Sequence, residues 1–252
     1  MTGISLYEPE ELVLSAGAGT PMSEIEEAGA NSRQQLAFEP PDLSALLGHD
    51  VGKGTLGGTI ACNLSGPRRI KAGGARDHFL GFKAVSGRGD AYKSGGRVVK
   101  NVTGYDLCKL LAGSWGTLGV MTELTIKVLP APEKTRTVLV LGLDAVNGVA
   151  ALTQAFHSPH DITGGTWLPE SLSAGSDASF VRDAGSSITA IRVEGPGPSV
   201  EYRCQALRDE LSSFGETEEL HGHNSRRFWT EVRDVRPFAK ARDTRPVWRI
   251  SV

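Results

Sequence analysis

The feature of this sequence that most constrains its fold is the placement of its glycines. The chain has 252 residues and 31 glycines, and 17 of these fall between Gly48 and Gly119. Glycine adopts positive φ angles and allows another group to approach the backbone closely. The segment is not repetitive, so the cluster favours a backbone wrapped round a ligand. A loop-rich region with many tight turns is the alternative, and composition alone does not separate the two.

The remaining composition is that of an ordinary globular protein and argues against several classes. Apolar residues make up 39% and charged residues 22%. A net charge of -2 gives no broad electrostatic case for nucleic acid. No stretch is apolar enough to predict a transmembrane segment, and the first residues show no secretory signal. Cys62, Cys108 and Cys204 form neither a metal spacing nor a disulfide framework, so we predict a cytoplasmic location.

The sequence changes in character at Pro130–Pro132, which predicts a first domain over residues 1–131 and a second over 132–252. In the first, alternation over Val120–Leu129 predicts a half-buried strand with Val120 facing inward and Met121 outward. A helix is predicted over Pro21–Ala30, with Thr20 as its N-cap. Other predicted elements are strands at Leu12–Ala16, Leu80–Val85 and Ala91–Lys93, and a helix at Asp106–Ala112.

The second half predicts a regular alternation of strands and helices. The order β-α-β-β-α-β resembles a ferredoxin-like sandwich. Its predicted strands are Thr137–Leu143, Ile162–Leu168, Ser187–Val193 and Glu216–Leu220, and its predicted helices are Ala145–Phe156, Val200–Phe214 and a last one at Arg226–Val235.

One motif suggests a nicotinamide dinucleotide site, and the sequence argues against it. Gly17-Ala18-Gly19 follows a strand and opens a helix, as a dinucleotide fingerprint does. The third glycine of that fingerprint is replaced by Met22, although its role is close helix–strand packing. We therefore interpret the motif as a tight strand-to-helix turn.

The main candidate site begins with Gly54-Thr55-Leu56-Gly57-Gly58-Thr59 and runs on to Arg69. Gly57 and Gly58 would place bare backbone N–H groups at the start of a short helix, which is typical of an anion site. The small polar side chains of Thr59, Asn63 and Ser65 can donate to phosphate, ribitol or ring oxygens, and two arginines, Arg68 and Arg69, add positive charge.

Two further blocks follow, Lys100-Asn101-Val102-Thr103-Gly104-Tyr105-Asp106-Leu107 and Gly113-Ser114-Trp115-Gly116-Thr117-Leu118-Gly119-Val120. Backbone groups at such a strand start can bind an adenine edge. The three blocks together resemble the vanillyl-alcohol oxidase type of flavoprotein, the PCMH-type FAD-binding domain. Together with Phe38-Glu39-Pro40-Pro41 and Ala75-Arg76-Asp77, they look like the glycolate oxidase E-subunit family within its D-2-hydroxyacid branch.

This resemblance implies an α+β protein: the second subdomain of a PCMH-type FAD-binding domain, followed by a ferredoxin-like cap domain over the flavin. It implies FAD as cofactor, glycolate or a similar 2-hydroxy acid as substrate, and a complex with a D-type flavin subunit and an iron–sulfur F-type subunit. Family members carry a preceding subdomain with a Gly-rich loop, so we expect a chain truncated at both ends. The residues implied to line the flavin and its pyrophosphate are Pro41, Gly57, Gly58, Thr59, Asn63, Ser65, Gly66 and Arg76, and those implied to meet the adenosine end are Gly116, Gly119 and Val120.

Alternatives remain open at this stage. The chain could be a structural partner that keeps the flavin fold without chemistry, since no general base is assignable. A flavin reductase of cell-wall precursor synthesis is a third option, which the second and third blocks disfavour. His221-Gly222-His223 is followed by Asn224-Ser225-Arg226 with no carboxylate in place, so we predict no metal site, and His78 could touch the flavin edge. Trp115, Trp167, Trp229 and Trp248 are predicted to pack in the core or cap.

Overall fold

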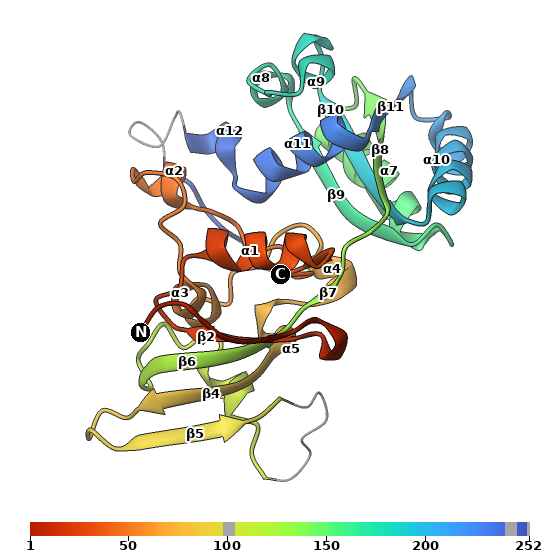
Figure 1. Cartoon of the computed structure of the whole chain (residues 1–252). Helices are drawn as coiled ribbons and strands as arrows, with labels where there is room; N and C mark the ends of the chain where they lie inside the picture. Colours follow the sequence, from red (N-terminus) through yellow and green to blue (C-terminus); the bar gives the residue numbers. More distant parts are fainter. Residues whose placement is uncertain (98–103, 240–245, 251–252) are drawn as a thin grey trace. The chain divides into compact units, whose positions relative to one another are not determined.

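The computed structural model describes residues 1–97, 104–239 and 246–250, and it divides into two compact units (Figure 1). Unit 1 comprises Met1–Ser44 and Gly48–Ala131, and unit 2 comprises Ala45–Leu47 and Pro132–Val252. Each unit has its own hydrophobic core. No helix among the described residues is long and apolar enough to cross a membrane.

Unit 1 is built on a five-stranded antiparallel sheet with the strand order β1-β2-β6-β4-β5. A two-stranded pairing of β3 with β7 accompanies it. The strands are β1 (Ile4–Glu8), β2 (Val13–Gly17), β3 (Gln34–Gln35), β4 (Phe79–Val85), β5 (Ala91–Gly95), β6 (Val120–Lys127) and β7 (Leu129–Pro130). The helices are η1 (Pro9–Glu11), α1 (Met22–Asn31), α3 (Leu56–Ala61), α4 (Arg69–Ala72), α5 (Ala75–His78) and α6 (Leu107–Leu111). The short helix α2 (Ser44–Leu47) begins at the last residue of the first segment of unit 1, and its other residues belong to unit 2.

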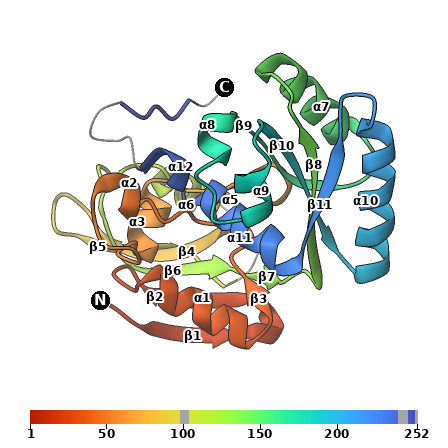
Figure 2. The same cartoon turned by 90° about the horizontal axis from the view of Figure 1, so that it is seen from above.

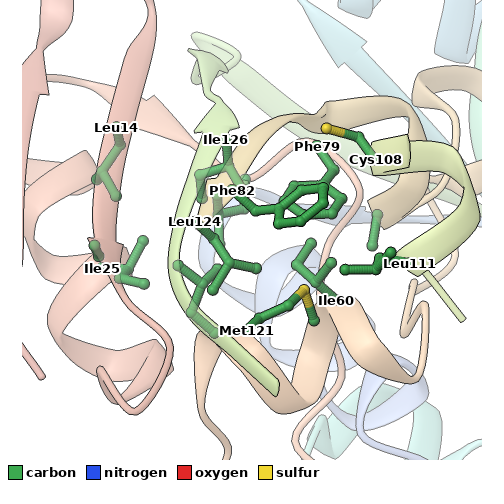
Figure 3. Packing of buried hydrophobic residues seen from close by; sticks show 14 of the residues in the cluster. Leu14, Ile25, Ile60, Phe79, Phe82, Cys108, Leu111, Met121, Leu124 and Ile126 are labelled. Atoms are coloured by element: carbon green, nitrogen blue, oxygen red, sulfur yellow. The ribbon is translucent and has the colours of Figure 1, made fainter. Parts of the chain in front are cut away.

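The core of unit 1 lies on one face of this sheet. Figure 3 shows Ile60 of α3 and Leu111 of α6 pointing toward Phe82 and Leu124 of the sheet. Ile60 and Leu124 are fully buried. The other face is polar, with the Lys83 ammonium 2.8 Å from a carboxylate oxygen of Glu123. The apolar face therefore fixes where α3 and α6 lie.

The predicted strand at Val120–Leu129 is present as β6, but the predicted facing of its first residues is wrong. Val120 is 61% exposed, whereas Met121 is buried at 8%. The pairing with β4 is irregular here, because Lys83 pairs with Glu123 and the next residue of β4 pairs with Met121. Thr122 is the extra residue, and a bulge of this kind reverses the alternation of side chains.

The predicted cap of α1 is also wrong. Pro21 occupies the N-cap position, and no side chain caps this helix. The Thr20 hydroxyl instead donates to the carbonyl of Gly3 at 3.2 Å. The Thr20 hydroxyl therefore bonds to the N-terminal segment and does not cap α1.

Unit 2 is an antiparallel sheet with the order β11-β8-β10-β9. In sequence its elements follow the order β-α-β-β-α-β, with two short helices between the second and third strands. The prediction of an α+β chain with a ferredoxin-like second half is confirmed. The strands are β8 (Lys134–Leu141), β9 (Ile162–Leu168), β10 (Ile188–Gly195) and β11 (Thr217–His221), and the helices are α7 (Ala145–His157), α8 (Glu170–Ser173), α9 (Ser179–Asp183), α10 (Gly197–Leu211), α11 (Gly222–Arg233) and α12 (Arg236–Ala239).

Both faces of the unit 2 sheet are covered by helices, as Figure 2 shows: α7 and α10 lie on one side, and α8, α9 and α11 on the other. Strand β8 alternates between the two cores. Val138 and Val140 pack with α7 and α10, whereas Leu139 packs with the aromatic residues of α11. This explains why β8 is apolar at consecutive positions.

A buried polar network joins the unit 2 sheet to α11. The Arg192 guanidinium lies 4.5 Å from the ring centroid of Trp229 and donates to the carbonyl of Thr163 at 3.1 Å. The Trp229 indole N–H donates to the Thr137 hydroxyl at 2.7 Å. Arg192 also lies 3.7 Å from a carboxylate oxygen of Glu194, and both side chains are almost fully buried. Arg192 is thus a paired cation inside the protein.

Candidate functional site

The glycine-rich start of α3 does not offer free amides. The N–H of Gly57 donates to the Ala18 carbonyl at 2.8 Å, and the N–H of Leu56 donates to the Thr20 carbonyl at 3.0 Å. The Gly58 N–H is 3.3 Å from the Thr55 hydroxyl, which caps the helix. The anion site expected from bare N–H groups at Gly57 and Gly58 is therefore not formed in this way, since neighbouring oxygens already accept from them.

These contacts explain the Gly17-Ala18-Gly19 motif as well. The Ala18 carbonyl accepts from the Gly57 amide of α3, in keeping with a tight strand-to-helix turn. A Cβ atom at Gly57 would lie 2.9 Å from the Cβ of Ala18. Glycine is required at position 57 because two backbone segments meet there.

The segment after α3 caps the short helix α5. The side-chain oxygen of Asn63 accepts from the N–H of Arg76, and the Ser65 hydroxyl accepts from the N–H of Ala75, both at 2.9 Å. The Asp77 carboxylate accepts from the N–H of Gly74 at 2.8 Å. Side-chain caps of this kind satisfy amides that a helix start leaves unpaired. Asn63 and Ser65 were predicted to donate hydrogen bonds to a ligand, and in the structure their oxygens accept hydrogen bonds from α5.

Gly74 lies in the middle of these groups. A Cβ atom placed on it would be 3.3 Å from the Ser65 hydroxyl, 3.6 Å from the Asn63 side-chain oxygen and 3.8 Å from the Nε atom of Arg69. The side chains of Arg69 and Arg76 are exposed. We call Asn63, Ser65, Arg69, Gly74 and Arg76 the Gly74 cluster. It combines hydrogen-bonding side chains with two exposed cations.

A lysine of α6 braces this cluster from the side. The Lys109 ammonium donates to the carbonyl of Arg76 at 2.6 Å and lies 3.7 Å from the Asp77 carboxylate. Asp106 caps α6 through the N–H of Lys109. The block predicted around Thr-Gly-Tyr-Asp therefore contributes through its last residues, whereas Lys100–Thr103 lie outside the described residues.

The charge of Arg68 is not offered to a ligand, contrary to the prediction. The Arg68 guanidinium lies 3.7 Å from one carboxylate oxygen of Glu39, and the backbone N–H of Arg68 donates to the other oxygen at 2.9 Å. Glu39 is buried and has a left-handed φ of 55°. The N–H of Gly66 donates to the Phe38 carbonyl at 3.0 Å, so the segment before Pro41 runs beside Gly66.

The glycine-bracketed loop before β6 begins at the Gly74 cluster. The N–H of Gly113 donates to the Ile60 carbonyl, and the N–H of Trp115 donates to the Ala61 carbonyl at 2.9 Å. A Cβ atom on Gly113 would be 3.5 Å from the Cβ of Asn63. At its other end, a Cβ on Gly119 would be 3.0 Å from the carbonyl oxygen of Val85 on β4.

Several residues near the site adopt the left-handed backbone region. Asn63 has φ 48° and Trp115 has φ 56°, and Gly116 has φ 72°. Strain of this kind in non-glycine residues is concentrated at functional sites. The side chain of Trp115 is 72% exposed, and that of Trp248 is 80% exposed. The prediction that these two tryptophans pack in a core is therefore wrong, whereas Trp229 is buried.

His78 was predicted as a possible neighbour of the flavin edge, and it lies buried beneath the cluster. Its ring lies 5.3 Å from that of Phe38, and its Nε2 atom is 2.9 Å from the Ala72 carbonyl. Burial lowers the pKa of this imidazole. Among the described residues, no hydrogen bond of good geometry reaches its buried Nδ1 atom. No sequence signal indicated this environment.

The structure therefore brings some of the predicted residues together and separates others. Asn63, Ser65 and Arg76 meet around Gly74. Thr59 is 3% exposed and so helps to hold α3 in place. Gly116 lies in the loop before β6 and Val120 is the first residue of β6, and both are exposed. The sequence analysis did not identify Gly74, Glu39 or Lys109 as site residues, although a glycine five residues after Arg69 and three before Asp77 is typical of a tight turn. No group of three or more metal-binding side chains occurs among the described residues.

Comparison with known proteins shows which family and which relatives the chain is similar to. Residues 1–95 match a family of FAD binding domains. The chain is 35% identical to the glycolate oxidase subunit GlcE of Escherichia coli, over 99% of this chain and 61% of that protein. It is 42% identical to the glycolate oxidase subunit GlcD of Bacillus subtilis over 41% of this chain and 21% of that protein, and 31% identical to a D-lactate dehydrogenase of Anaerostipes hadrus over 62% of this chain and 31% of that protein.

In fold, the chain is similar to an alkyldihydroxyacetonephosphate synthase, with a TM-score of 0.68 at 21% identity. The match covers 94% of this chain and 45% of that one. The chain thus spans only part of each of these relatives. The predicted resemblance to flavin-linked oxidase subunits and the FAD-binding fold are confirmed, and the match to an FAD binding domain supports FAD as the cofactor. The assignment of unit 1 and unit 2 as flavin and cap domains stays a prediction.

Proposed function

Starting from the FAD-binding domain in residues 1–95, we propose that this chain is the FAD-binding subunit of a glycolate oxidase complex. The complex would oxidise glycolate or a similar 2-hydroxy acid to the 2-oxo acid and pass electrons to its partners. Similarity to two glycolate oxidase subunits and to D-lactate dehydrogenase supports this class of oxidoreductase. The proposed partners are a D-type flavin subunit and an iron–sulfur F-type subunit, and the proposed location is cytoplasmic, peripheral to the inner membrane through these partners.

The observation that carries the proposal is the Gly74 cluster. The contacts with α5 use the acceptor oxygens of Asn63 and Ser65, which leaves the amide NH₂ and the hydroxyl hydrogen to donate outward. Arg69 and Arg76 add exposed positive charge. Donors and cations fit the anionic pyrophosphate and the oxygen-bearing edge of FAD, which supplies a two-electron acceptor when bound.

The protein's own residues would bind and orient the cofactor. The cap on α5 holds the backbone of Arg76 in place, and Lys109 braces the same residue from α6. At Gly116 no atom of the described residues, apart from its two chain neighbours, lies within 4 Å of a Cβ position, so there is room for a ligand beside its backbone. We assign Gly116, Gly119 and Val120 to the adenosine end, where backbone groups bind without side chains.

The proposal is tested on the complex purified with its partner subunits. We expect flavin to be bound by this subunit, and glycolate to reduce an artificial dye. Arg76→Gln removes an exposed cation of the Gly74 cluster and is expected to lower both flavin content and activity. Arg88→Gln, at an exposed turn between β4 and β5, is the matched control and should change neither. A complex in which this subunit carries no flavin would overturn the proposal.

A second candidate is a structural subunit that retains the flavin fold without chemistry. It is favoured by one observation, the occupation of the Leu56 and Gly57 amides by protein carbonyls. This candidate predicts a complex that keeps full activity when Arg76 is replaced. Flavin content measured subunit by subunit separates the two candidates.

A further inference from the structure

One helix of unit 2 carries an unusual exposed face. His223, Arg226, Arg227 and Thr230 recur at the spacing of one helical face on α11, and we call them the α11 basic face. Together with Arg236 and Asp177, they line a hollow of about 550 Å³. The opposite side of the helix holds Ser225, Phe228 and Trp229, which are buried. The basic side chains therefore do not contribute to the core.

The two central arginines of this face differ from the other arginines of unit 2. In the part of the chain that the structure describes, neither the Arg226 nor the Arg227 side chain forms an ion pair or hydrogen bond. Arg236 differs, because it lies 3.2 Å from the Asp234 carboxylate and 4.0 Å from that of Asp177. Other arginines of unit 2 are engaged: Arg136 with Glu201 and Glu219, Arg192 with Glu194, and Arg203 with the carbonyls of His160 and Glu194.

Helix stability does not explain this placement. Positive charge is favoured near the C-terminus of a helix, and the effect of the dipole fades within the end turn. Arg226 and Arg227 lie in the second turn of α11, where the dipole gives them no stabilisation. Among the described residues that line the hollow, Asp177 alone carries a carboxylate against three arginines, so the lining is positively charged. An anionic ligand would offset the repulsion between these like charges.

The shape of the face favours an extended ligand with several negative charges. From His223 to Thr230 the face is about 10 Å long at the rise of an α-helix. All of its basic side chains are exposed, whereas sites for small molecules enclose the ligand with mostly apolar walls. A single small carboxylate would contact only part of it. The net charge of -2 for the whole chain disfavours nucleic acid.

We infer that the α11 basic face is a docking surface for an acidic protein segment, with Arg226 and Arg227 pairing with Asp or Glu side chains of the partner. Arginine binds carboxylates through two parallel hydrogen bonds and is enriched at protein interfaces. Charge complementarity sets the specificity of such contacts and makes them sensitive to salt. The inference goes beyond the proposed function and requires no bound flavin.

The test is a titration of the whole chain with a fluorescein-labelled oligoglutamate peptide at low salt, read by fluorescence anisotropy. We expect saturable binding that the double variant Arg226→Gln/Arg227→Gln weakens about tenfold or more. The control Lys53→Gln/Arg88→Gln removes the same charge from exposed positions of unit 1 and should change the affinity by less than about twofold. Arg226→Lys/Arg227→Lys keeps the charge and should retain part of the binding.

Three results would overturn the inference. One is the absence of saturable binding by the wild-type chain. Another is an equal loss in the Arg226/Arg227 and the Lys53/Arg88 variants, which would indicate a general charge effect. The third is binding of an oligothymidylate of the same length as tightly as the peptide, which would indicate a nucleic-acid surface. Circular dichroism of each variant checks that the exposed substitutions leave the fold intact.

Discussion

In unit 1 short helices are fixed by side chains that cap single backbone amides, whereas in unit 2 a buried polar network fastens a helix to a fully covered sheet. Asn63 and Ser65 hold α5 in unit 1. Arg192, Trp229 and Thr137 hold α11 in unit 2. Unit 1 therefore depends on local hydrogen bonds between side chains and backbone, which leave hydrogen-bond donors at its surface. Unit 2 depends on contacts buried in its core.

The largest effect on this comparison is expected from Arg192→Met. The substitution removes the Arg192 cation and its hydrogen bonds, and it leaves the Glu194 carboxylate buried. Breaking a buried ion pair in this way lowers the free energy of unfolding by about 3–5 kcal/mol. Hydrogen exchange read by peptide mass spectrometry reports each unit separately, and only unit 2 should lose protection. Arg182→Met removes an exposed ion pair and is the control. Loss of protection in unit 1 alone would contradict the assignment.

A smaller effect is expected from Gly57→Ala in unit 1. The added Cβ would meet the Cβ and carbonyl of Ala18 at 2.9 Å, and overpacking of this kind costs about 1–3 kcal/mol. Gly87→Ala is the matched control, because among the described residues, its two chain neighbours apart, no atom lies within 4 Å of its Cβ position. Chemical denaturation compares the two variants. Equal stability would mean that the contact between α3 and the Gly17–Gly19 turn is looser than described.

The two units should also respond to pH in opposite directions. The pKa of buried His78 is lowered from 6.5, so its contribution to unit 1 is present above that pH and lost as pH falls through the folded-state pKa. Burial raises the pKa of Glu231 from 4.5, so its contribution to unit 2 is present below that pH and lost as pH rises through the folded-state pKa.

Hydrogen exchange of each unit across this pH range measures the two responses. His78→Gln should flatten the response of unit 1 alone, and Glu231→Gln that of unit 2 alone. If both variants changed the pH response of the same unit, the prediction that the two units respond in opposite directions would be wrong.

The smallest effect concerns thiol reactivity and involves no change in stability. Burial raises the pKa of the Cys108 thiol to about 11 and that of the Cys204 thiol to about 12, so both stay protonated at neutral pH. Cys62 is half-buried beside Asn63 and should react first with Ellman's reagent. Peptide mapping identifies the labelled residue, and early labelling of Cys204 would show that the core of unit 2 opens readily.

Much of the fold could be predicted from local sequence. Strand β9 has the predicted bounds Ile162–Leu168, because apolar residues and flanking breakers define it. The orientation of Val120 and Met121 could not be predicted, since it depends on a bulge against β4. The cap of α1 failed for a similar reason, because the Thr20 hydroxyl bonds to a segment outside the helix.

The sequence predicted which residues belong to the candidate site, but not the hydrogen bonds that they form. Asn63, Ser65 and Arg76 were predicted site residues, and the structure brings them together. Their bonding to α5 depends on a chain reversal that no local pattern encodes. The Gly57 amide is taken by Ala18, and the Arg68 charge by Glu39, in each case from an earlier part of the chain. Hydrogen-bond and ion-pair partners that lie far away in the sequence cannot be predicted from the spacing of residues.

The most direct test of the central claim, that the Gly74 cluster holds FAD, is a titration of the chain with FAD followed by flavin absorbance. Asn63→Asp keeps an acceptor for the Arg76 N–H but replaces the outward amide donor with negative charge. We predict saturable binding by the wild type, and about tenfold weaker binding by Asn63→Asp at unchanged stability. Equal FAD affinity of the two proteins, or no saturation by the wild type, would contradict the account.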